Sequence, residues 1–328
     1  MRRLASVLER ERPAVARVLV FAGGPGFSAT DGSTTPARLV RAVRERLAGV
    51  LGGVPFASGT NQFFTELNRN RPETDGVDGI AYSMNPQVHA ADDLSLMENL
   101  EPQAETVRMT RALGGGLPVF VGPVTLVGRS GPFPGGPPPL GGLAGNVDVR
   151  QASLFCAAWT VGSLRQLAGA GTDALTYFST RGHRGIIELD DPDHLDARFP
   201  SRPGDVFPVY HVLADVADLE QEQAEVVLSA SADPRRVELV AMRDEKRVRV
   251  LVANLTQRPQ TAALALPEPG PVEARMLDAS TAPAAMRDPG AYRRSSHEMR
   301  REEDGTVALE LPPFAVCRID VARGGPRG

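Results

Sequence analysis

Two short runs of the chain are crowded with side chains that can do acid–base and binding chemistry. The first, GTNQFFTELNRNRP from Gly59 to Pro72, holds one carboxylate, four amides and two guanidinium groups, and the second, YSMNPQVHA, extends from Tyr82 to Ala90. Each lies at the end of a short apolar segment, Val54 to Ala57 and Gly79 to Tyr82 respectively. Because parallel α/β sheets present reactive side chains at the carboxyl ends of their strands, we expect both runs to line one site.

Glu66 and His89 are the residues of these runs that can carry protons. A partly desolvated carboxylate has its pKa raised toward the working pH, so Glu66 can serve as a general base. The alternative is that Glu66 only pairs with Arg69 or Arg71. His89 lies seven residues beyond Tyr82, where an imidazole can exchange a proton with Glu66 or with a leaving oxygen. The alternative for His89 is a loop histidine with satisfied hydrogen bonds.

The remaining polar side chains of the two runs are suited to binding. Neutral amides donate to an oxyanion or orient substrate hydroxyls, and Asn68 is the amide that we expect to act in catalysis. Guanidinium groups match a planar carboxylate, although one of the two is equally well explained as a structural ion-pair partner. The Tyr82 hydroxyl can reach over a substrate, but a tyrosine at a strand end more often packs with its hydroxyl satisfied. The expected substrate-binding residues are Asn61, Arg69, Arg71, Asn85 and Gln87.

A later segment adds further candidates. His183, in the glycine-rich turn TRGHRG, follows the strand-like segment Ala174 to Phe178, and Glu188 comes shortly after it. We expect His183 to face the same site and to take part in catalysis. His183 and Glu188 are both expected in a second layer of residues around the substrate. His211 has apolar neighbours on a helix and is expected in the core, bonded to backbone. His194 and His297 are expected in exposed loops.

Several other chemistries are disfavoured. Glu66, His89 and His183 are conceivable metal ligands, but no His-x-His or His-Glu-x-x-His spacing is present, and we expect neither metal nor cofactor. The sequence has no Gly-x-Ser-x-Gly motif, so a serine-hydrolase mechanism is not expected. The run GGPGF after the first strand contains a proline and has no phosphate-loop lysine, so nucleotide binding is not expected.

The elements that must position these side chains form a repeating β/α pattern. Helical spacing is present over Pro36 to Val50, near Leu94 to Leu113 and over Ser153 to Ala170, where Trp159 is expected in the core. Five β/α units predict the last part of a TIM-type barrel, which needs eight strands, so we expect the chain to be the carboxyl-terminal part of a longer protein. The strand-like segments are Val15 to Phe21, Val54 to Ala57, Gly79 to Tyr82, Pro118 to Val124 and Ala174 to Phe178.

Two further segments complete the predicted organisation. The stretch from Gly128 to Gly145 is rich in glycine and proline and predicts a long loop, either a lid or disordered. Short alternating strands between Ala224 and Val321 predict a β-sandwich, interrupted by an exposed loop from Asp278 to Glu303. We expect a partial, catalytic barrel over residues 1–219 and a carboxyl-terminal β-sandwich over residues 220–328, an α/β plus all-β chain.

Composition narrows the possible partners. A net charge of −4 and a pI near 5.8 give no electrostatic reason to expect nucleic acid or a membrane surface as partner. No apolar span reaches the roughly 20 residues of a membrane helix, and residues 1–12 lack the apolar centre of a signal peptide. Cys156 and Cys317 are isolated and are expected to be buried thiols. We expect a cytoplasmic protein that binds a small molecule, and an oligomer is possible.

The motifs resemble the D-apionate lactonase family of bacterial sugar-lactone hydrolases. The resemblance extends over most of residues 15–215 and is weaker in the predicted sandwich. It implies a (β/α) barrel followed by a sandwich and preceded by another β-rich domain, and an activity on a sugar lactone in D-apiose catabolism. The motifs that carry it are GTNQFFTELNRNRP from Gly59, DGIAYSMNPQVHA from Asp78, PVFVGPVTL from Pro118, SLFCAAWTVGSL from Ser153 and VFPVYHVLAD from Val206.

The chemistry of lactone opening predicts general-base activation of water. Opening a lactone needs a nucleophile at the acyl carbon, donors for the oxyanion and an acid for the ring oxygen. Glu66 is the expected base, the amides and Tyr82 the expected donors, and His89 or His183 the expected acid. Two alternatives stay open: a glycoside hydrolase, which needs a pair of carboxylates, and a sugar-binding module without turnover.

Overall fold

The computed structural model describes residues 1–22, 34–128, 142–143, 146–194, 196–219, 224–266 and 268–323. The chain forms two compact units, each with its own packing. The first, which we call the sheet unit, consists of Met1–Asn85, Pro102–Thr125 and Ala170–Tyr177. The second, which we call the sandwich unit, consists of Pro86–Glu101, Leu126–Gly169 and Phe178–Gly328. The predicted loop at 129–141 and 144–145 and the run GGPGF lie outside the described residues.

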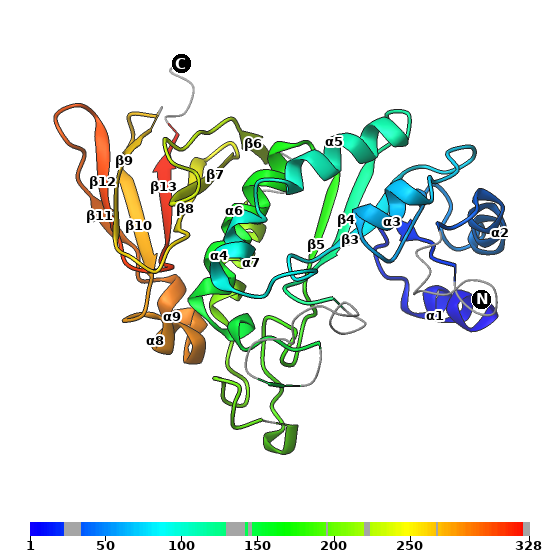
Figure 1. Cartoon of the computed structure of the whole chain (residues 1–328), viewed down its shortest axis with the longest axis horizontal. Helices are drawn as coiled ribbons and strands as arrows, with labels where there is room; N and C mark the ends of the chain where they lie inside the picture. Colours follow the sequence, from blue (N-terminus) through cyan, green and yellow to red (C-terminus); the bar gives the residue numbers. More distant parts are fainter. Residues whose placement is uncertain are drawn as a thin grey trace. The chain divides into compact units, whose positions relative to one another are not determined.

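A five-stranded parallel sheet is the centre of the sheet unit (Figure 1). β2 and β3 are buried at every position, as expected for strands of a parallel sheet that is covered on both faces. Gly59 allows β2 and β3 to approach, because a Cβ at this residue would lie 1.9 Å from the Ala81 carbonyl oxygen. The prediction of five strands in chain order is confirmed: β1 (Val18–Leu19), β2 (Phe56–Gly59), β3 (Ile80–Met84), β4 (Val119–Val124) and β5 (Ala174–Tyr177).

The helices within the first 113 residues differ in part from those predicted. α2 (Ala37–Leu47) packs through a buried face and confirms the predicted helix. The helical segment predicted near residues 94–113 is divided into α4 (Asp93–Glu98) and α5 (Gln103–Leu113), because Pro102 lacks the N–H that a continuous helix would need. α1 (Arg2–Glu11) and α3 (Phe64–Arg69) were not predicted, and α3 lies inside the first polar run.

Helix α6 (Leu154–Gly169) is the most deeply buried helix described in the sandwich unit. It is apolar nearly all round, which is typical of a helix with neighbours on every side. Trp159 is fully buried and its indole N–H donates to the Leu96 carbonyl at 3.1 Å, so its predicted place in the core is confirmed. α7 (Pro208–Ala217) contacts α6, and two short 3-10 helices, η1 (Val149–Ala152) and η2 (Pro192–His194), lie in the connecting segments.

The carboxyl-terminal part forms the predicted sandwich of antiparallel sheets (Figure 1). Its core contains alternating inward-facing residues such as Val250, Ile319 and Leu309. A two-stranded sheet has the order β12-β9, and a six-stranded sheet has the order β11-β10-β13-β8-β7-β6. The strands are β6 (Glu225–Val227), β7 (Val237–Arg243), β8 (Arg247–Asn254), β9 (Gln260–Ala265), β10 (Val272–Leu277), β11 (His297–Met299), β12 (Thr306–Leu311) and β13 (Val316–Ala322).

The prediction of an exposed loop from Asp278 to Glu303 is wrong. The segment forms α8 (Ala282–Arg287), α9 (Pro289–Arg293) and strand β11. Some of its apolar side chains are placed inward: Ala285 is fully buried, and Tyr292 is buried against the His211 ring at 4.5 Å between centroids. His297, expected in a loop, is exposed on β11.

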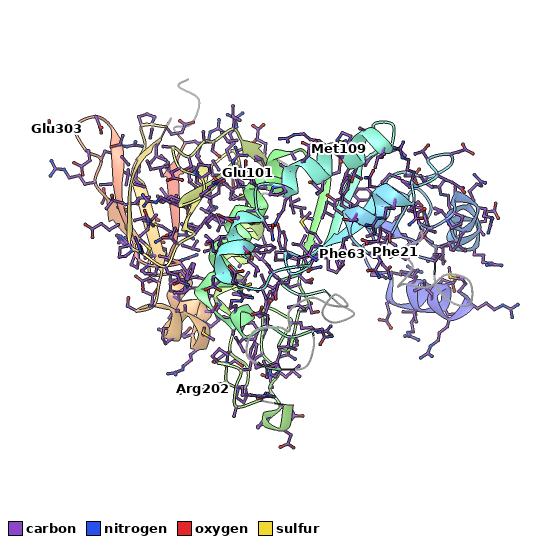
Figure 2. The ribbon with its side chains drawn as sticks, viewed as in Figure 1. Phe21, Phe63, Glu101, Met109, Arg202 and Glu303 are labelled. Atoms are coloured by element: carbon purple, nitrogen blue, oxygen red, sulfur yellow. The ribbon has the colours of Figure 1, made fainter. Side chains whose placement is uncertain are left out.

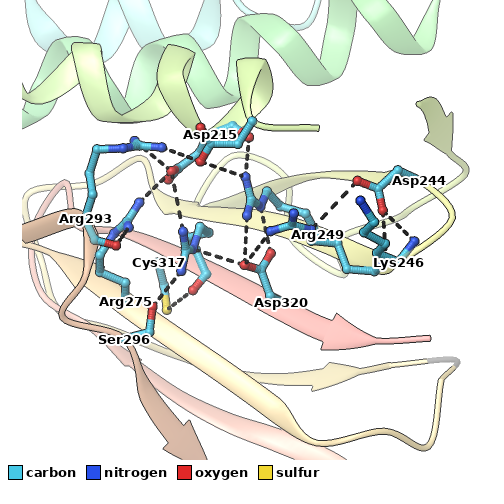
Figure 3. A network of polar contacts seen from close by, with 12 residues as sticks. Asp215, Asp244, Lys246, Arg249, Arg275, Arg293, Ser296, Cys317 and Asp320 are labelled. Atoms are coloured by element: carbon cyan, nitrogen blue, oxygen red, sulfur yellow. Dashed lines mark hydrogen bonds and ion pairs between the residues drawn. The ribbon is translucent and has the colours of Figure 1, made fainter. Parts of the chain in front are cut away.

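A buried ionic network joins α7 to the sandwich (Figure 3). The Asp215 carboxylate accepts hydrogen bonds from Arg275 at 2.5 Å and from Arg293 at 3.0 Å. Arg249 donates to both carboxylate oxygens of Asp320, at 2.7 and 2.9 Å, and to the Asp215 carbonyl at 2.5 Å. Since Arg249, Arg275 and Asp215 are each less than 5% exposed, the charges must be paired to remain in this position.

Candidate active site

Glu66 lies in the first turn of α3, directly after β2, where it caps the helix. Its Oε2 accepts the backbone N–H of Phe63, a residue labelled in Figure 2, at 3.1 Å, which is the glutamate half of a capping box at the start of the helix. Its Oε1 lies 4.0 Å from the Arg69 guanidinium. The side chain is 19% exposed, so a small part of it reaches solvent. These contacts give Glu66 a structural role, and its role as a base stays a prediction.

Tyr82 is fully buried on β3. Its hydroxyl lies 2.7 Å from Thr106 Oγ1, and the Thr106 hydroxyl itself donates to the Gln103 carbonyl, so the tyrosine is the donor in this pair. Burial raises the pKa of the Tyr82 hydroxyl well above its ordinary value. The hydroxyl is therefore a protonated donor engaged in the packing between β3 and α5.

The other polar groups of the two runs differ in exposure. Asn61 follows β2 and is half-buried, while Asn68, Arg69 and Arg71 are exposed and Asn85 is half-buried. Ser83, which the sequence did not single out, is buried between the carboxyl ends of three strands. Its hydroxyl contacts the Asn61 carbonyl at 3.1 Å and the Gly122 carbonyl at 3.3 Å. Ser83 thus ties together the strand ends on which the first part of the site depends.

In the sandwich unit, Gln87 is buried and braces two connecting segments. Its amide nitrogen donates to the Leu126 carbonyl at 2.9 Å and to Asp148 Oδ2 at 2.7 Å. The same Asp148 carboxylate pairs with the buried Arg150 at 2.6 Å, and Arg150 reaches Asp93 at 2.8 Å. Asp148 and Arg150 were not predicted; the available signal was that Asp148 precedes a helical turn, η1, which it caps.

The segment after β5 contains the most enclosed histidine–carboxylate pair of the candidate residues. His183 Nε2 lies 3.5 Å from Glu188 Oε2, and the imidazole stacks on Phe199 with 4.3 Å between ring centroids. Glu188 is 1% exposed and accepts hydrogen bonds from the Ser201 hydroxyl at 2.5 Å and the Leu189 N–H at 2.8 Å. His89, by contrast, is exposed.

The predicted site residues are distributed over both units. Asn61, Glu66, Asn68, Arg69, Arg71, Tyr82 and Asn85 belong to the sheet unit, and Gln87, His89 and His183 belong to the sandwich unit. The expectation that Glu66 and His89 share one cavity therefore stays a prediction. His211 is confirmed as a core histidine, with Nε2 at 3.1 Å from the Ala285 carbonyl.

In the part of the chain that the structure describes, no three His, Cys, Asp or Glu side chains gather as metal ligands. No described helix combines the length and apolar character needed to cross a membrane. Both cysteines are buried free thiols, as expected.

Comparison with known families gives matches over nearly the whole chain. Residues 1–221 match the family described as D-apionate lactonase, TIM barrel domain, and residues 234–319 match D-apionate lactonase, C-terminal immunoglobulin-like domain. The D-apionate lactonase of Brucella anthropi is 28% identical over 214 residues, which are 64% of this chain and 33% of that protein. The chain thus spans about a third of the length of this curated relative.

Solved structures share the fold at low sequence identity. The α-L-arabinofuranosidase of Thermotoga maritima, in complex with arabinose, has a TM-score of 0.59 at 11% identity, over 90% of this chain and 63% of that chain. A monomeric β-xylosidase from Caulobacter crescentus has a TM-score of 0.53 at 12% identity, over 98% of this chain and 73% of that chain. These similarities support a barrel followed by a sandwich, and they give no information about the activity of this chain.

Proposed function

The chain belongs to the D-apionate lactonase family, and from this we propose that it hydrolyses a sugar lactone of the D-apionolactone type to the aldonic acid. The observation that carries the proposal is the match to both family domains, in order, within one chain. The reaction would be a step of D-apiose catabolism. The curated relative is about three times longer than the matched region. The activity is therefore proposed for the chain in the context of the longer family architecture.

The chain offers the groups that lactone opening needs. A base must take a proton from water as the water oxygen attacks the acyl carbon, and the same or another group must then protonate the ring oxygen. Glu66, His89 and His183 are the candidates for proton transfer. Asn61, Asn68 and Asn85 would orient substrate hydroxyls or the oxyanion, and an exposed guanidinium from Arg69 or Arg71 would attract the product carboxylate.

The direct test is acid release from a branched aldonolactone by the purified chain. We expect release faster than in buffer alone, and slower release from an unbranched lactone of the same ring size. The proposal is overturned if calorimetry shows that the chain binds the sugar acid but acid release is never accelerated, even when the chain is tested within the full-length family architecture. The chain would then be a sugar-binding module.

Glycoside hydrolysis is the second candidate, since the barrel-plus-sandwich fold also occurs in glycosidases. A retaining glycosidase needs two carboxylates about 5 Å apart at the mouth of the barrel. β4 ends with Gly122, Pro123 and Val124. The segment that follows it, Thr125 to Gly128, contains no acidic residue. Release of the phenol from an aryl glycoside, lost in Glu66→Gln, would favour this alternative over lactone hydrolysis.

The cytoplasmic location also stays a proposal. It is supported by Cys156 and Cys317, which are buried thiols of the kind that persist in a reducing compartment. Burial raises the pKa of both thiols, so neither is suited to act as a nucleophile.

A further inference from the structure

We propose that His183 is the proton-transfer group of this hydrolysis and that Glu188 is its positioning residue. The inference rests on the proposed function, because it assigns a role within that reaction. It is carried by a cluster that lies entirely within the sandwich unit: His183, Glu188, Phe199 and Ser201.

Glu188 is a carboxylate fixed in place. Its side chain is 1% exposed, Oε1 accepts the Leu189 N–H at 2.8 Å, and Oε2 accepts the Ser201 hydroxyl at 2.5 Å. Its own backbone N–H donates to the Asp205 carbonyl at 2.8 Å, which anchors the segment on both sides. A buried carboxylate held by donors of this kind is preorganised to orient a further donor.

His183 is that donor. Its Nε2 is buried and has no hydrogen-bond partner within bonding geometry among the described residues, while Glu188 Oε2 lies 3.5 Å away. Catalytic hydrogen bonds are often long before substrate binds and shorten in the complex. An N–H on Nε2 directed at Glu188 leaves the lone pair on Nδ1, and the side chain is 18% exposed, so part of the ring reaches solvent.

Asp196, a second carboxylate near the imidazole, is already paired with Arg198. Asp196 interacts electrostatically with His183, but its two oxygens accept from the Arg198 side chain at 2.9 and 2.6 Å. Phe199 covers one face of the ring, with 25° between the two planes. Glu188 is therefore the carboxylate that sets the tautomer, and Phe199 fixes the plane in which the ring lies.

The proposed step balances without a co-reactant other than water. His183 Nδ1 takes a proton from water while the water oxygen bonds to the lactone carbonyl carbon, and the carbonyl electron pair moves onto its oxygen. When that pair returns, the bond from the acyl carbon to the ring oxygen breaks, and the imidazolium gives its proton to the ring oxygen. The sum is lactone plus water to hydroxy acid, with His183 neutral again.

Glu188→Gln provides a sharp test of the positioning role. The Leu189 N–H requires an oxygen at the Oε1 position, so the new amide NH2 must take the place of Oε2 and face Ser201 and His183. His183 Nε2 must then accept, which moves the ring proton to Nδ1. Proton–nitrogen correlation spectra of histidine-labelled protein, recorded at about pH 8, should show Nε2–H in the native protein and Nδ1–H in the variant. His183→Asn assigns the signal among the five histidines.

Asp205→Asn is the matched control. Asp205 is also a buried acid of this segment, and its carboxylate accepts the Arg202 N–H at 2.9 Å. Asn keeps an oxygen that can accept this N–H, and the Asp205 backbone carbonyl that bonds Glu188 is unchanged, so the variant should leave the His183 tautomer and kcat unchanged. A native protein with Nδ1–H, or the same tautomer in both native protein and Glu188→Gln, would overturn the positioning role whatever the activity.

Kinetics on the lactone test the catalytic role separately. His183→Asn and Glu188→Gln should each lower kcat by about 100-fold or more with little change in KM, the loss expected when a general acid–base group is removed or mis-oriented. Glu188→Asp, which keeps the charge, should recover part of kcat. If the native protein hydrolyses lactones and His183→Asn retains its kcat, the catalytic role is overturned; if the native protein is inert on every lactone, the proposed function fails, and the tautomer measurement still decides the pairing.

Discussion

The Glu66 carboxylate can cap a helix or act as a base toward a substrate, and two substitutions at this residue can separate these roles. Gln at this position keeps an oxygen that accepts the Phe63 N–H but cannot act as a base, whereas Ala removes both functions. With His183 as the proton-transfer group, we expect Glu66→Gln to retain kcat and the free energy of unfolding. Glu66→Ala should lower the free energy of unfolding by about 1 kcal/mol, as measured by urea denaturation. A large loss of kcat in Glu66→Gln would instead identify Glu66 as the base.

His211 predicts a pH dependence of stability. Burial lowers its pKa to about 4, from an ordinary value of 6.5, so the unfolded chain binds a proton over this range that the folded chain does not. The stabilisation is present above pH 6.5 and is lost as the pH falls from 6.5 to about 4, by about 3 kcal/mol in total.

The measurement is the free energy of unfolding by urea at several pH values. His211→Gln should flatten the curve between pH 6.5 and 4, whereas His297→Gln, a change at an exposed histidine, should leave its shape unchanged. Parallel curves for the native protein and His211→Gln would show that another group causes the acid sensitivity.

Residue types predicted burial better than they predicted roles. The surroundings of Trp159, His211 and the two cysteines in the sequence are apolar, and all four are buried as expected. The capping role of Glu66 could be read only once α3 was known to begin at Phe64. Asp148 and Ser201 have short polar side chains common in loops, and nothing local to the sequence indicates that Gln87 and Glu188 would bond to them.

At the scale of elements, α7 is held to the sandwich by charges as well as by apolar contacts. Asp215→Asn would leave Arg275 and Arg293 facing a neutral partner in a buried position. We expect the free energy of unfolding to fall by about 3–5 kcal/mol, the cost typical of breaking a buried ion pair. The control is Asp75→Asn, whose pair with Arg41 at 3.3 Å is exposed and should contribute at most about 1 kcal/mol.

Denaturant titration of both variants checks this prediction. Equal, small losses for the two substitutions would mean that water enters the network and screens its charges. Restoration of stability by an apolar replacement of the whole cluster would leave the prediction intact, because the cost comes from an unpaired charge rather than from the pair itself.

Strands were predicted more accurately than short helices, for a physical reason. β8 and β10 are the segments RVRVLVAN and VEARML, each of which begins with alternating apolar and polar residues, a strong local signal for a strand. α8, α9 and α3 have five or six residues each, less than two turns, and such helices depend on tertiary contacts rather than on periodicity. The break between α4 and α5 could have been predicted from Pro102.

At the scale of the whole molecule, the order of barrel and sandwich could be predicted because the type of periodicity changes along the chain. Site geometry could not be predicted in the same way. The candidate residues are divided between two compact units, and a sequence pattern contains no information on how side chains from different units approach one another. The boundary expected near Leu219 stays a prediction, and the packing of α6 suggests how to examine it.

Helix α6 precedes that boundary, yet it packs against β7, β8 and β13 of the sandwich. A fragment ending at Leu219 would expose the face of α6 that these strands cover, and each large apolar side chain left in water costs about 1.5–3 kcal/mol. We therefore expect the fragment 1–219 to lose cooperative thermal unfolding. Trp159 is the only tryptophan and is 0% exposed in the whole chain, so its fluorescence should shift to longer wavelength in the fragment. A fragment with the emission of the whole chain and a sharp melting transition would show that the barrel residues fold without the sandwich.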